Sequence, residues 1–226
     1  VANGEVHTEF ICTESEHSAM TACIAAAATG ARTFTASASA GLALMHEMLT
    51  VASGSRFPIV MAVANRALSS PLNIHGDHSD SMAERDSGWI HIYVENAQEA
   101  YDSILQAFRI AEDVEVSLPI IVGLDGFTLT HTLERVDTLS DQTVKEFIGE
   151  RKLPNVLTHE GKTVPYKLDP DNPMTMGPIA LQNYYFEFKR QQDEAMKNAY
   201  KKIQEINKEF AQISGRSYGN GLIDCY

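Results

Sequence analysis

Two uninterrupted apolar runs constrain the fold of this chain more than any other feature. Residues 57–64 read F-P-I-V-M-A-V-A, and residues 118–124 read L-P-I-I-V-G-L. A strand without polar alternation is buried on both faces, as in a parallel sheet covered by helices. The two runs therefore predict central strands of an α/β domain.

Shorter β-rich segments and helical patterns alternate with these runs. Further strands are predicted at residues 9–13, 32–37 and 89–94, and helices at residues 18–29, 41–52 and 97–111. This repeated order predicts a mostly parallel sheet flanked by helices and joined by right-handed crossovers. We expect this α/β domain to occupy residues 1–135.

Residues 136–226 differ from the preceding domain in composition and in predicted secondary structure. Prolines interrupt a polar stretch at positions 154, 165, 170, 173 and 178. A long helix with charged faces is predicted for residues 179–213, and residues 222–226 are typical of the entry to a strand. We expect a C-terminal helical extension that straps onto a neighbouring domain or subunit and leads toward a second domain.

Charge and cysteine usage exclude several classes of protein. The net charge is −12 with only 18 Lys and Arg residues, which disfavours binding to nucleic acid or an anionic membrane. No apolar run reaches the roughly 18 residues of a membrane span, and the first residues lack a signal-peptide pattern. Cys12, Cys23 and Cys225 form no C-x-x-C pair, so we expect no zinc or iron–sulfur centre on this chain and a cytoplasmic location.

Ligands of such sheets bind beyond the carboxyl ends of the strands, which directs attention to four polar loops. They span residues 14–18, 35–41, 65–80 and 125–131. In the first loop, Glu14, Glu16 and His17 begin a helix, where Ser15 or Ser18 fits an N-cap. The acids are therefore either capping residues or functional carboxylates.

The second and third loops offer groups for an anionic ligand. The small residues of T-A-S-A-S-A-G-L, residues 35–42, allow close approach to backbone N–H groups, although no Walker-type ending follows. Arg66 follows an apolar run and could bind a carboxylate through two hydrogen bonds, or form a structural ion pair. The cluster of His75, Asp77, His78 and Asp80 is either a polar turn or the metal site of a hydrolase.

Five short segments of the sequence, taken together in chain order, match the pattern of a known family. They are E-S-E-H-S-A (14–19), G-L-A-L-M-H-E (41–47), N-R-A-L-S-S-P-L-N-I (65–74), D-H-S-D-S-M-A-E-R-D-S-G-W-I (77–90) and L-D-G-F-T-L-T-H-T (124–132). Together they resemble the pyrimidine-binding domain in the α subunit of pyruvate:ferredoxin oxidoreductases, within the 2-oxoacid:ferredoxin oxidoreductase family. The resemblance continues more loosely through the long helix and G-R-S-Y-G.

This resemblance implies roles for individual residues. Glu16 corresponds to the glutamate that bonds N1′ of the aminopyrimidine ring of thiamine diphosphate, and Arg66 to the arginine at the substrate carboxylate. It also implies that Ser39, Gly41 and Asn65 line the cofactor cleft. A carboxyl that shares a proton with N1′ favours the tautomer that activates the thiazolium, so we expect Glu16 to be buried.

The resemblance also implies a larger enzyme. It implies oxidative decarboxylation of a 2-oxoacid, with pyruvate as the default, to acyl-coenzyme A and CO₂, with electrons passing to ferredoxin. Thiamine diphosphate would be shared with another subunit. Mg²⁺ and [4Fe-4S] clusters would reside on partner β, γ and ferredoxin-like δ subunits, since no G-D-G motif occurs here.

Some features depart from the family pattern. The usual first βα unit, with its Y-P-I-T-P-like loop, is missing here, and Ala40 stands where glutamine is usual. Three alternatives stay open: a transketolase-like or decarboxylase-like thiamine enzyme, the metal-dependent hydrolase, and a non-catalytic scaffold subunit.

Overall fold

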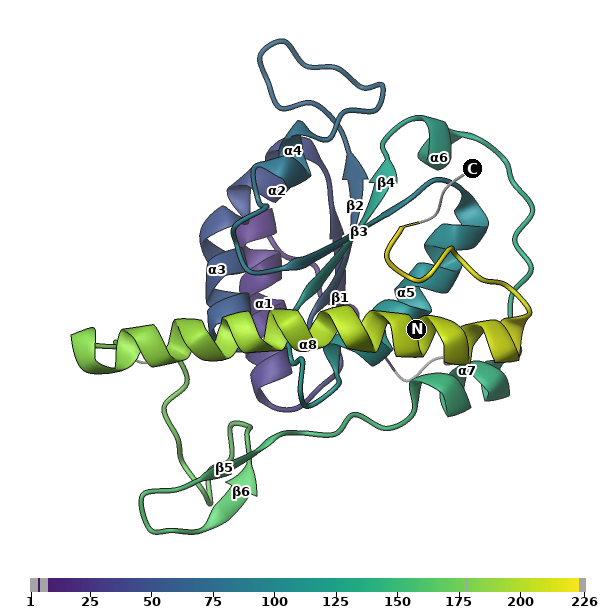
Figure 1. Ribbon diagram of the computed structural model, residues 1–226. Helices are drawn as coiled ribbons and strands as arrows, with labels where there is room; N and C mark the ends of the chain where they lie inside the picture. The colour runs from purple at the N-terminus through teal and green to yellow at the C-terminus, as the bar shows by residue number, and fades with distance from the viewer. Residues whose placement is uncertain (1–3, 5–7, 178, 224–226) are drawn as a thin grey trace.

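The computed structural model describes residues 4, 8–177 and 179–223, and a four-stranded parallel sheet forms its centre (Figure 1). The strands are β1 (Phe34–Ser37), β2 (Val60–Asn65), β3 (Ile90–Val94) and β4 (Ile120–Asp125), in the order β1-β2-β4-β3. Val60 pairs with Phe34 on one side and with Ile120 on the other. The predicted parallel α/β fold is confirmed.

Helices cover both faces of this sheet. One face carries α1 (Glu16–Ala28), α2 (Ser39–Leu44) and α3 (His46–Gly54), and the other carries α5 (Ala97–Ala111), α7 (Asp141–Ile148) and α8 (Gln182–Ser214). The short helices α4 (Ser79–Met82) and α6 (Thr128–His131) lie near the carboxyl ends of the strands (Figure 1). The molecule is thus a three-layer α/β/α sandwich.

The apolar runs occupy the two central strands, as predicted. Val60 and Ile120 face the cluster of α5 and α8, whereas Met61 and Ile121 face the cluster of α1 and α3, and all four have no exposed surface. Successive side chains of a strand point to opposite faces, so an uninterrupted apolar run fills both cores. Each such side chain contributes about 1.5–3 kcal/mol on burial.

Two predicted elements differ in the structure. Residues 9–13 form no strand, and Phe10 and Ile11 are 77% and 65% exposed. A β-rich sequence forms a strand only where a partner edge is available, and this segment lies outside the sheet. The predicted helix at 41–52 is instead two helices, α2 and α3, which meet at Met45.

The region after His131 contains more structure than the prolines suggested. It forms α7 and a small antiparallel hairpin of β5 (Asn155–Leu157) and β6 (Thr163–Pro165) before α8 begins. The 33-residue α8 confirms the predicted long helix and crosses the face formed by α5 (Figure 1). No described helix has the length and apolar character to span a membrane. The cytoplasmic location stays a prediction.

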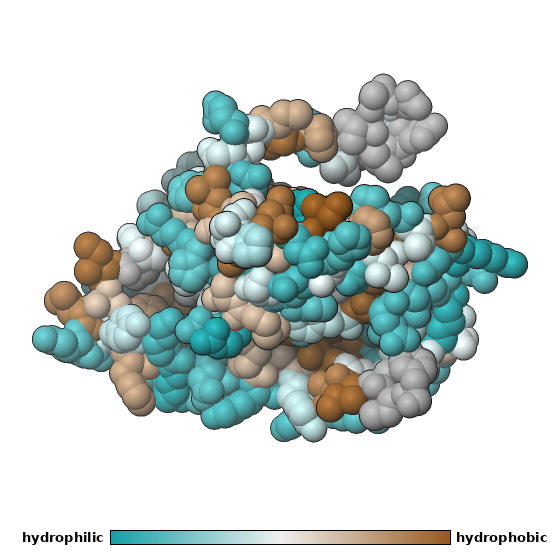
Figure 2. All heavy atoms as spheres, turned by 90° about the horizontal axis from the view of Figure 1, so that it is seen from above, coloured by the Kyte–Doolittle hydropathy of each residue, from teal (hydrophilic) through white to brown (hydrophobic). Residues whose placement is uncertain are grey.

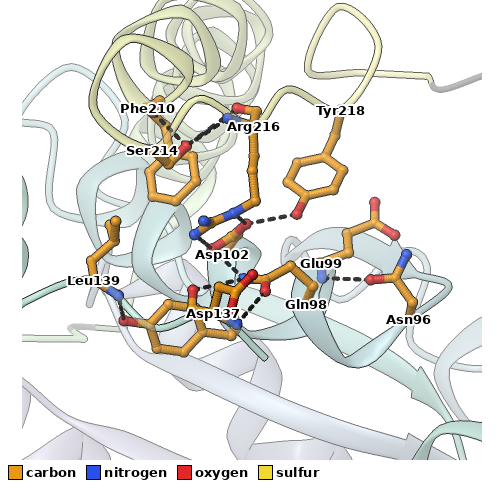
Figure 3. A network of polar contacts seen from close by, with 11 residues as sticks. Asn96, Gln98, Glu99, Asp102, Asp137, Leu139, Phe210, Ser214, Arg216 and Tyr218 are labelled. Carbon is orange, nitrogen blue, oxygen red and sulfur yellow. Dashed lines mark hydrogen bonds and ion pairs between the residues drawn. The ribbon is translucent and has the colours of Figure 1, made fainter. Parts of the chain in front are cut away.

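The segment after α8 returns to α5 through a polar network (Figure 3). Arg216 donates from Nε and Nη2 to the two oxygens of Asp102, at 2.6 and 2.7 Å, and Tyr218 donates its hydroxyl to the same carboxylate. The Asp102 side chain has no exposed surface. Burial and the neighbouring Asp102 carboxylate raise the pKa of Tyr218 well above its ordinary value.

Two predictions about the C-terminal region remain untested. The predicted strand at 222–226 falls partly outside the described residues, and Leu222 and Ile223 lie in no strand. The division into residues 1–135 and 136–226 also stays a prediction.

Candidate cofactor and substrate site

The predicted polar loops meet at the carboxyl edge of the sheet. Figure 1 shows this edge at the top, where β2 and β4 end beside α2, α4 and α6. Seen from above, this face is mostly hydrophilic with separate apolar groups (Figure 2). Exposed apolar side chains of the loop after β2 and of α4 include Leu72, Ile74 and Met82.

Glu16 lies against the backbone of Gly41. A β-carbon added at residue 41 would lie 2.8 Å from Oε1 of Glu16 and 2.8 Å from Oγ of Ser37. Oγ of Ser37 is itself buried and has no hydrogen-bond partner in the described part of the chain. The first turn of α1 and the end of β1 therefore bring an acid and an unpaired hydroxyl together.

Capping also occurs in this loop, but through a different residue. Ser15 is the N-cap of α1 and accepts a hydrogen bond from the Ser18 backbone at 3.2 Å. This bond satisfies one N–H group of the first turn, so the helix start does not need the side chain of Glu16 as a cap.

The expected burial of Glu16 is not found in this chain by itself. The Glu16 side chain is exposed, because it faces the carboxyl edge of the sheet and no described residue covers it. Shielding of this carboxyl would require atoms from outside these residues.

Arg66 stands at the end of β2 with an unengaged guanidinium. No hydrogen bond or ion pair joins this guanidinium to another described residue, so the structure gives no support to the structural ion pair. The Arg66 side chain is half-buried, and its Cγ packs against Gly126 at the start of the loop after β4. An unpaired guanidinium held at this edge is free to bind an anion.

Ser39 and Asn65 lie deeper than Glu16 and Arg66. Ser39 is 3% exposed and Asn65 is fully buried. Oγ of Ser39 donates to the carbonyl of Ala67 at 2.7 Å, and the Asn65 amide donates to Asp80 and Ser81. Their contact with a cofactor stays a prediction. In this structure both side chains bond to residues of the segment after β2.

The side chains of the histidines and acids after β2 do not point toward a common position at which a metal ion could bind. His75 packs on the Phe127 ring at 4.4 Å, and His78 packs edge-on against the Tyr93 ring at 5.2 Å. Asp80 turns inward and is 1% exposed. Among the described residues, no group of three or more His, Cys, Asp or Glu side chains could hold a metal ion, so the hydrolase alternative has no geometric support.

The sequence interpretation missed the role of Asp80 and its neighbours. It treated Asp80 as part of either a polar turn or a metal site, whereas the structure makes it an acceptor for backbone and amide donors from several segments. An acid followed by serine at the start of a short helix was the only local signal. The partners 14 to 41 residues away could not be deduced from it.

Comparison with solved structures identifies the class of fold. A 2-oxoglutarate:ferredoxin oxidoreductase from Magnetococcus marinus, solved with 2-oxoglutarate, coenzyme A and succinyl-CoA bound, is similar with a TM-score of 0.61. The match covers 85% of this chain and 37% of that chain at 19% identity. The fold is therefore of the class of α/β domains that such oxidoreductases contain.

Sequence comparison then identifies the family. The chain belongs to the family described as "Pyruvate flavodoxin/ferredoxin oxidoreductase, thiamine diP-bdg", whose profile matches residues 1–208. The resemblance inferred from the five strings is thereby confirmed.

Several curated relatives are similar over nearly the whole chain. Pyruvate synthase subunit PorA of Methanocaldococcus jannaschii is 58% identical over 226 residues, and that of Thermotoga maritima is 54% identical over 218. Ketoisovalerate oxidoreductase subunit VorA of Pyrococcus horikoshii is 44% identical over 226 residues. These matches cover 100%, 96% and 100% of this chain, but 56%, 53% and 54% of the relatives. The chain thus spans about half the length of the relatives it matches.

Proposed function

We propose that this chain supplies the pyrimidine-side half of a thiamine diphosphate site in a 2-oxoacid:ferredoxin oxidoreductase. The assembled enzyme would convert pyruvate and coenzyme A into acetyl-coenzyme A and CO₂ and pass two electrons to ferredoxin. The observation that carries this proposal is the placement of the Glu16 carboxylate over Gly41, at the same edge as the unengaged guanidinium of Arg66.

The residues at this edge fit the aminopyrimidine end of the cofactor. Glu16 offers a carboxyl for the N1′ nitrogen, and the unpaired Oγ of Ser37 offers a further hydrogen-bonding group. Gly41 leaves room for the Glu16 carboxylate against the backbone. When bound, thiamine diphosphate supplies the carbanion that attacks the carbonyl carbon of the oxoacid.

Glu16 and Arg66 would have different tasks in this reaction. Glu16 holds a proton at N1′ and so selects the tautomer of the ring. Covering by a second chain would remove water from a carboxyl that is exposed here, and would strengthen that hydrogen bond. Arg66 binds the carboxylate of the oxoacid through its planar donors and orients the neighbouring carbonyl.

The remaining components are proposed to reside on other subunits. The 226 residues contain neither a G-D-G motif for diphosphate and Mg²⁺ nor a cysteine pattern for [4Fe-4S] clusters. Partner β, γ and ferredoxin-like δ subunits would hold these groups. Pyruvate is proposed as the oxoacid because the relatives with 58% and 54% identity are named pyruvate synthase subunits, whereas the ketoisovalerate relative has 44%.

The test is Glu16→Gln in the full-length chain, assembled with its partner subunits. Glutamine keeps the shape but cannot share the proton, so pyruvate-dependent reduction of ferredoxin or a viologen dye should fall by about 10²- to 10⁴-fold. The matched control is Glu14→Gln, because Glu14 is exposed in the same loop. Normal turnover of the Glu16→Gln enzyme refutes the proposal.

The same assay separates the proposal from a transketolase-like or decarboxylase-like enzyme. Such an enzyme would consume pyruvate without reducing the dye. Dye reduction that needs both coenzyme A and pyruvate supports the oxidoreductase and also excludes the scaffold alternative.

A further inference from the structure

Asp80 joins three segments of the site through one buried carboxylate. Oδ2 accepts from the backbone N–H groups of Ser39 at 2.9 Å and Arg66 at 3.0 Å. Oδ1 accepts from the side-chain amide of Asn65 at 2.9 Å and from the backbone N–H of Ser81 at 2.7 Å. The two oxygens thus receive four N–H donors, the set that an ionised carboxylate accepts.

No cation compensates this carboxylate in the described part of the chain. Asp80 is 1% exposed and has no ion pair with a described Lys, Arg or His. Among the hydrogen-bond partners of the Asp80 carboxylate, Arg66 is the basic residue, and it contributes only its backbone N–H. Burial of an unpaired charge is costly, and amide donors offset only part of that cost.

The bond from Ser39 holds an unfavourable backbone conformation. Ser39 has a φ of 47°, in the left-handed region that non-glycine residues rarely adopt. Its N–H donates to Asp80, and its Oγ donates to the carbonyl of Ala67, just after Arg66. The loop after β1 is therefore bound twice to the segment after β2.

These contacts connect the two residues that the proposed function assigns to chemistry. Ser39 begins α2 and lies two positions before Gly41, on which the Glu16 carboxylate rests. Arg66 is the substrate-binding candidate. Because Ser39 and Arg66 share a single oxygen of Asp80, that oxygen sets how far apart the two loops lie.

We propose that Asp80 is a positioning residue, which fixes the Arg66 guanidinium relative to the Gly41–Glu16 contact through backbone hydrogen bonds to Ser39 and Arg66. This inference rests on the proposed function and deepens it. Asp80 does not touch substrate in this role. It acts by keeping Arg66 where the carboxylate of the 2-oxoacid has to bind.

The test is Asp80→Asn in the full-length chain of the assembled enzyme. The amide has nearly the same shape, but it turns an NH₂ donor toward groups that are themselves donors. Arg66 is then displaced, and the KM for pyruvate should rise at least about 10-fold, because positioning errors near 1 Å have effects of up to 10²-fold. The control is Asp86→Asn, since Asp86 is exposed and six residues farther along the chain; its KM should stay within twofold of wild type.

A double-mutant cycle distinguishes positioning from a purely structural role. If Asp80 acts through Arg66, Asp80→Asn should change the KM much less in an Arg66→Lys background than in the wild type. A purely structural role predicts equal effects in both backgrounds, together with a lower Tm. Equal effects, or a wild-type KM in folded Asp80→Asn, overturn the inference.

A second variant covers the case in which Asp80→Asn does not assemble. Asp80→Ser removes the charge and leaves room for water to bond the freed N–H groups. A raised KM in this variant supports the inference, whereas failure of both variants to assemble assigns Asp80 to folding alone and overturns it. Loss of activity in Glu16→Gln together with a normal KM in Asp80→Asn removes this inference only. Normal activity in Glu16→Gln refutes the proposed function, and the inference about Asp80 with it.

Discussion

The carboxylate of Glu16 occupies the space that a side chain at Gly41 would need. Oε1 of Glu16 lies 2.8 Å from the position of a β-carbon at residue 41, which is closer than real β-carbon contacts allow. The other obstructing atom is Oγ of Ser37, also at 2.8 Å. Because both obstructing groups are side chains, a larger residue would move Glu16 and the Ser37 hydroxyl rather than unfold α2.

Gly41→Ala should therefore reduce turnover more than stability. The displaced Glu16 should lower kcat of the assembled enzyme by about 10- to 100-fold. Tm should change little, because alanine is more favourable than glycine within a helix by about 1 kcal/mol. Gly54→Ala is the matched control, since Gly54 also lies in a helix and a β-carbon there would meet no atom within 4 Å. Wild-type kcat in Gly41→Ala would show that the contact is unimportant.

Gly126→Ala should displace the Arg66 side chain, which packs against Gly126. A β-carbon at residue 126 would overlap the backbone oxygen of Asn65 and Cγ of Arg66. Overpacking of this kind costs about 1–3 kcal/mol, so Tm should fall. The displaced guanidinium should raise the KM for pyruvate about 10-fold or more. Steady-state kinetics on the assembled enzyme would contradict the prediction if KM stayed unchanged while Tm fell.

Arg216→Ala should destabilise the chain strongly. It leaves the fully buried Asp102 carboxylate with Tyr218 but without its cation. Loss of one partner from a buried pair costs about 3 kcal/mol, which corresponds to a fall in Tm of roughly 6–12 °C at this chain length. Arg190→Ala is the control, because the pairs of Arg190 with Glu187 and Glu194 are exposed on α8. Equal losses in the two variants would show that burial of Asp102 is not the cause.

Glu84→Gln should change how stability depends on pH. The Glu84 side chain is 2% exposed and bonds Nδ1 of His46 at 2.8 Å. Burial raises the pKa of Glu84 above the ordinary value of 4.5, and the bond to His46 only partly opposes this. Its stabilising contribution is thus complete below pH 4.5 and is lost as pH rises through the folded-state pKa.

Glutamine at position 84 cannot ionise, so this loss should disappear. Relative to wild type, the Glu84→Gln chain should gain thermal stability as pH rises from 4.5 toward 8. Glu47→Gln, at a side chain that is 80% exposed, should show no such trend. The measurement is Tm of the wild type and the Glu84→Gln chain across this pH range. A constant difference in Tm between these two proteins would contradict the prediction.

Local patterns were sufficient for the central layer of the fold. The runs at residues 57–64 and 118–124 could be placed because successive side chains of β2 and β4, such as Val60 and Met61 or Ile120 and Ile121, fill the cores on opposite faces of the sheet. The pattern around residues 97–111 also predicted α5. The structure shows that Asn96 caps this helix by accepting a hydrogen bond from the Glu99 backbone. In these segments the interactions that decide the structure lie within a few residues.

The misplaced features depend on distant partners. Phe10 and Ile11 look like strand residues, but no sheet edge receives them in the described structure. Asp80 could be predicted only as part of a polar turn or a metal site, and its bonds to Ser39 and Arg66 could not be predicted because they cross 41 and 14 positions of sequence. Burial of Glu16 could not be judged from one chain, because its exposure depends on whatever covers the carboxyl edge of the sheet.

The strand order has a consequence for synthesis on the ribosome. β4 is the last of the four strands to be made, yet it lies between β2 and β3 and pairs with both. In a nascent chain that has emerged only through Val94, β2 therefore has one unpaired edge and β3 has no partner strand, because the strand that pairs with both is missing. Such intermediates aggregate readily. The yield of folded protein should therefore depend on how fast the ribosome translates the segment between β3 and β4, and on whether chaperones bind the nascent chain during that time.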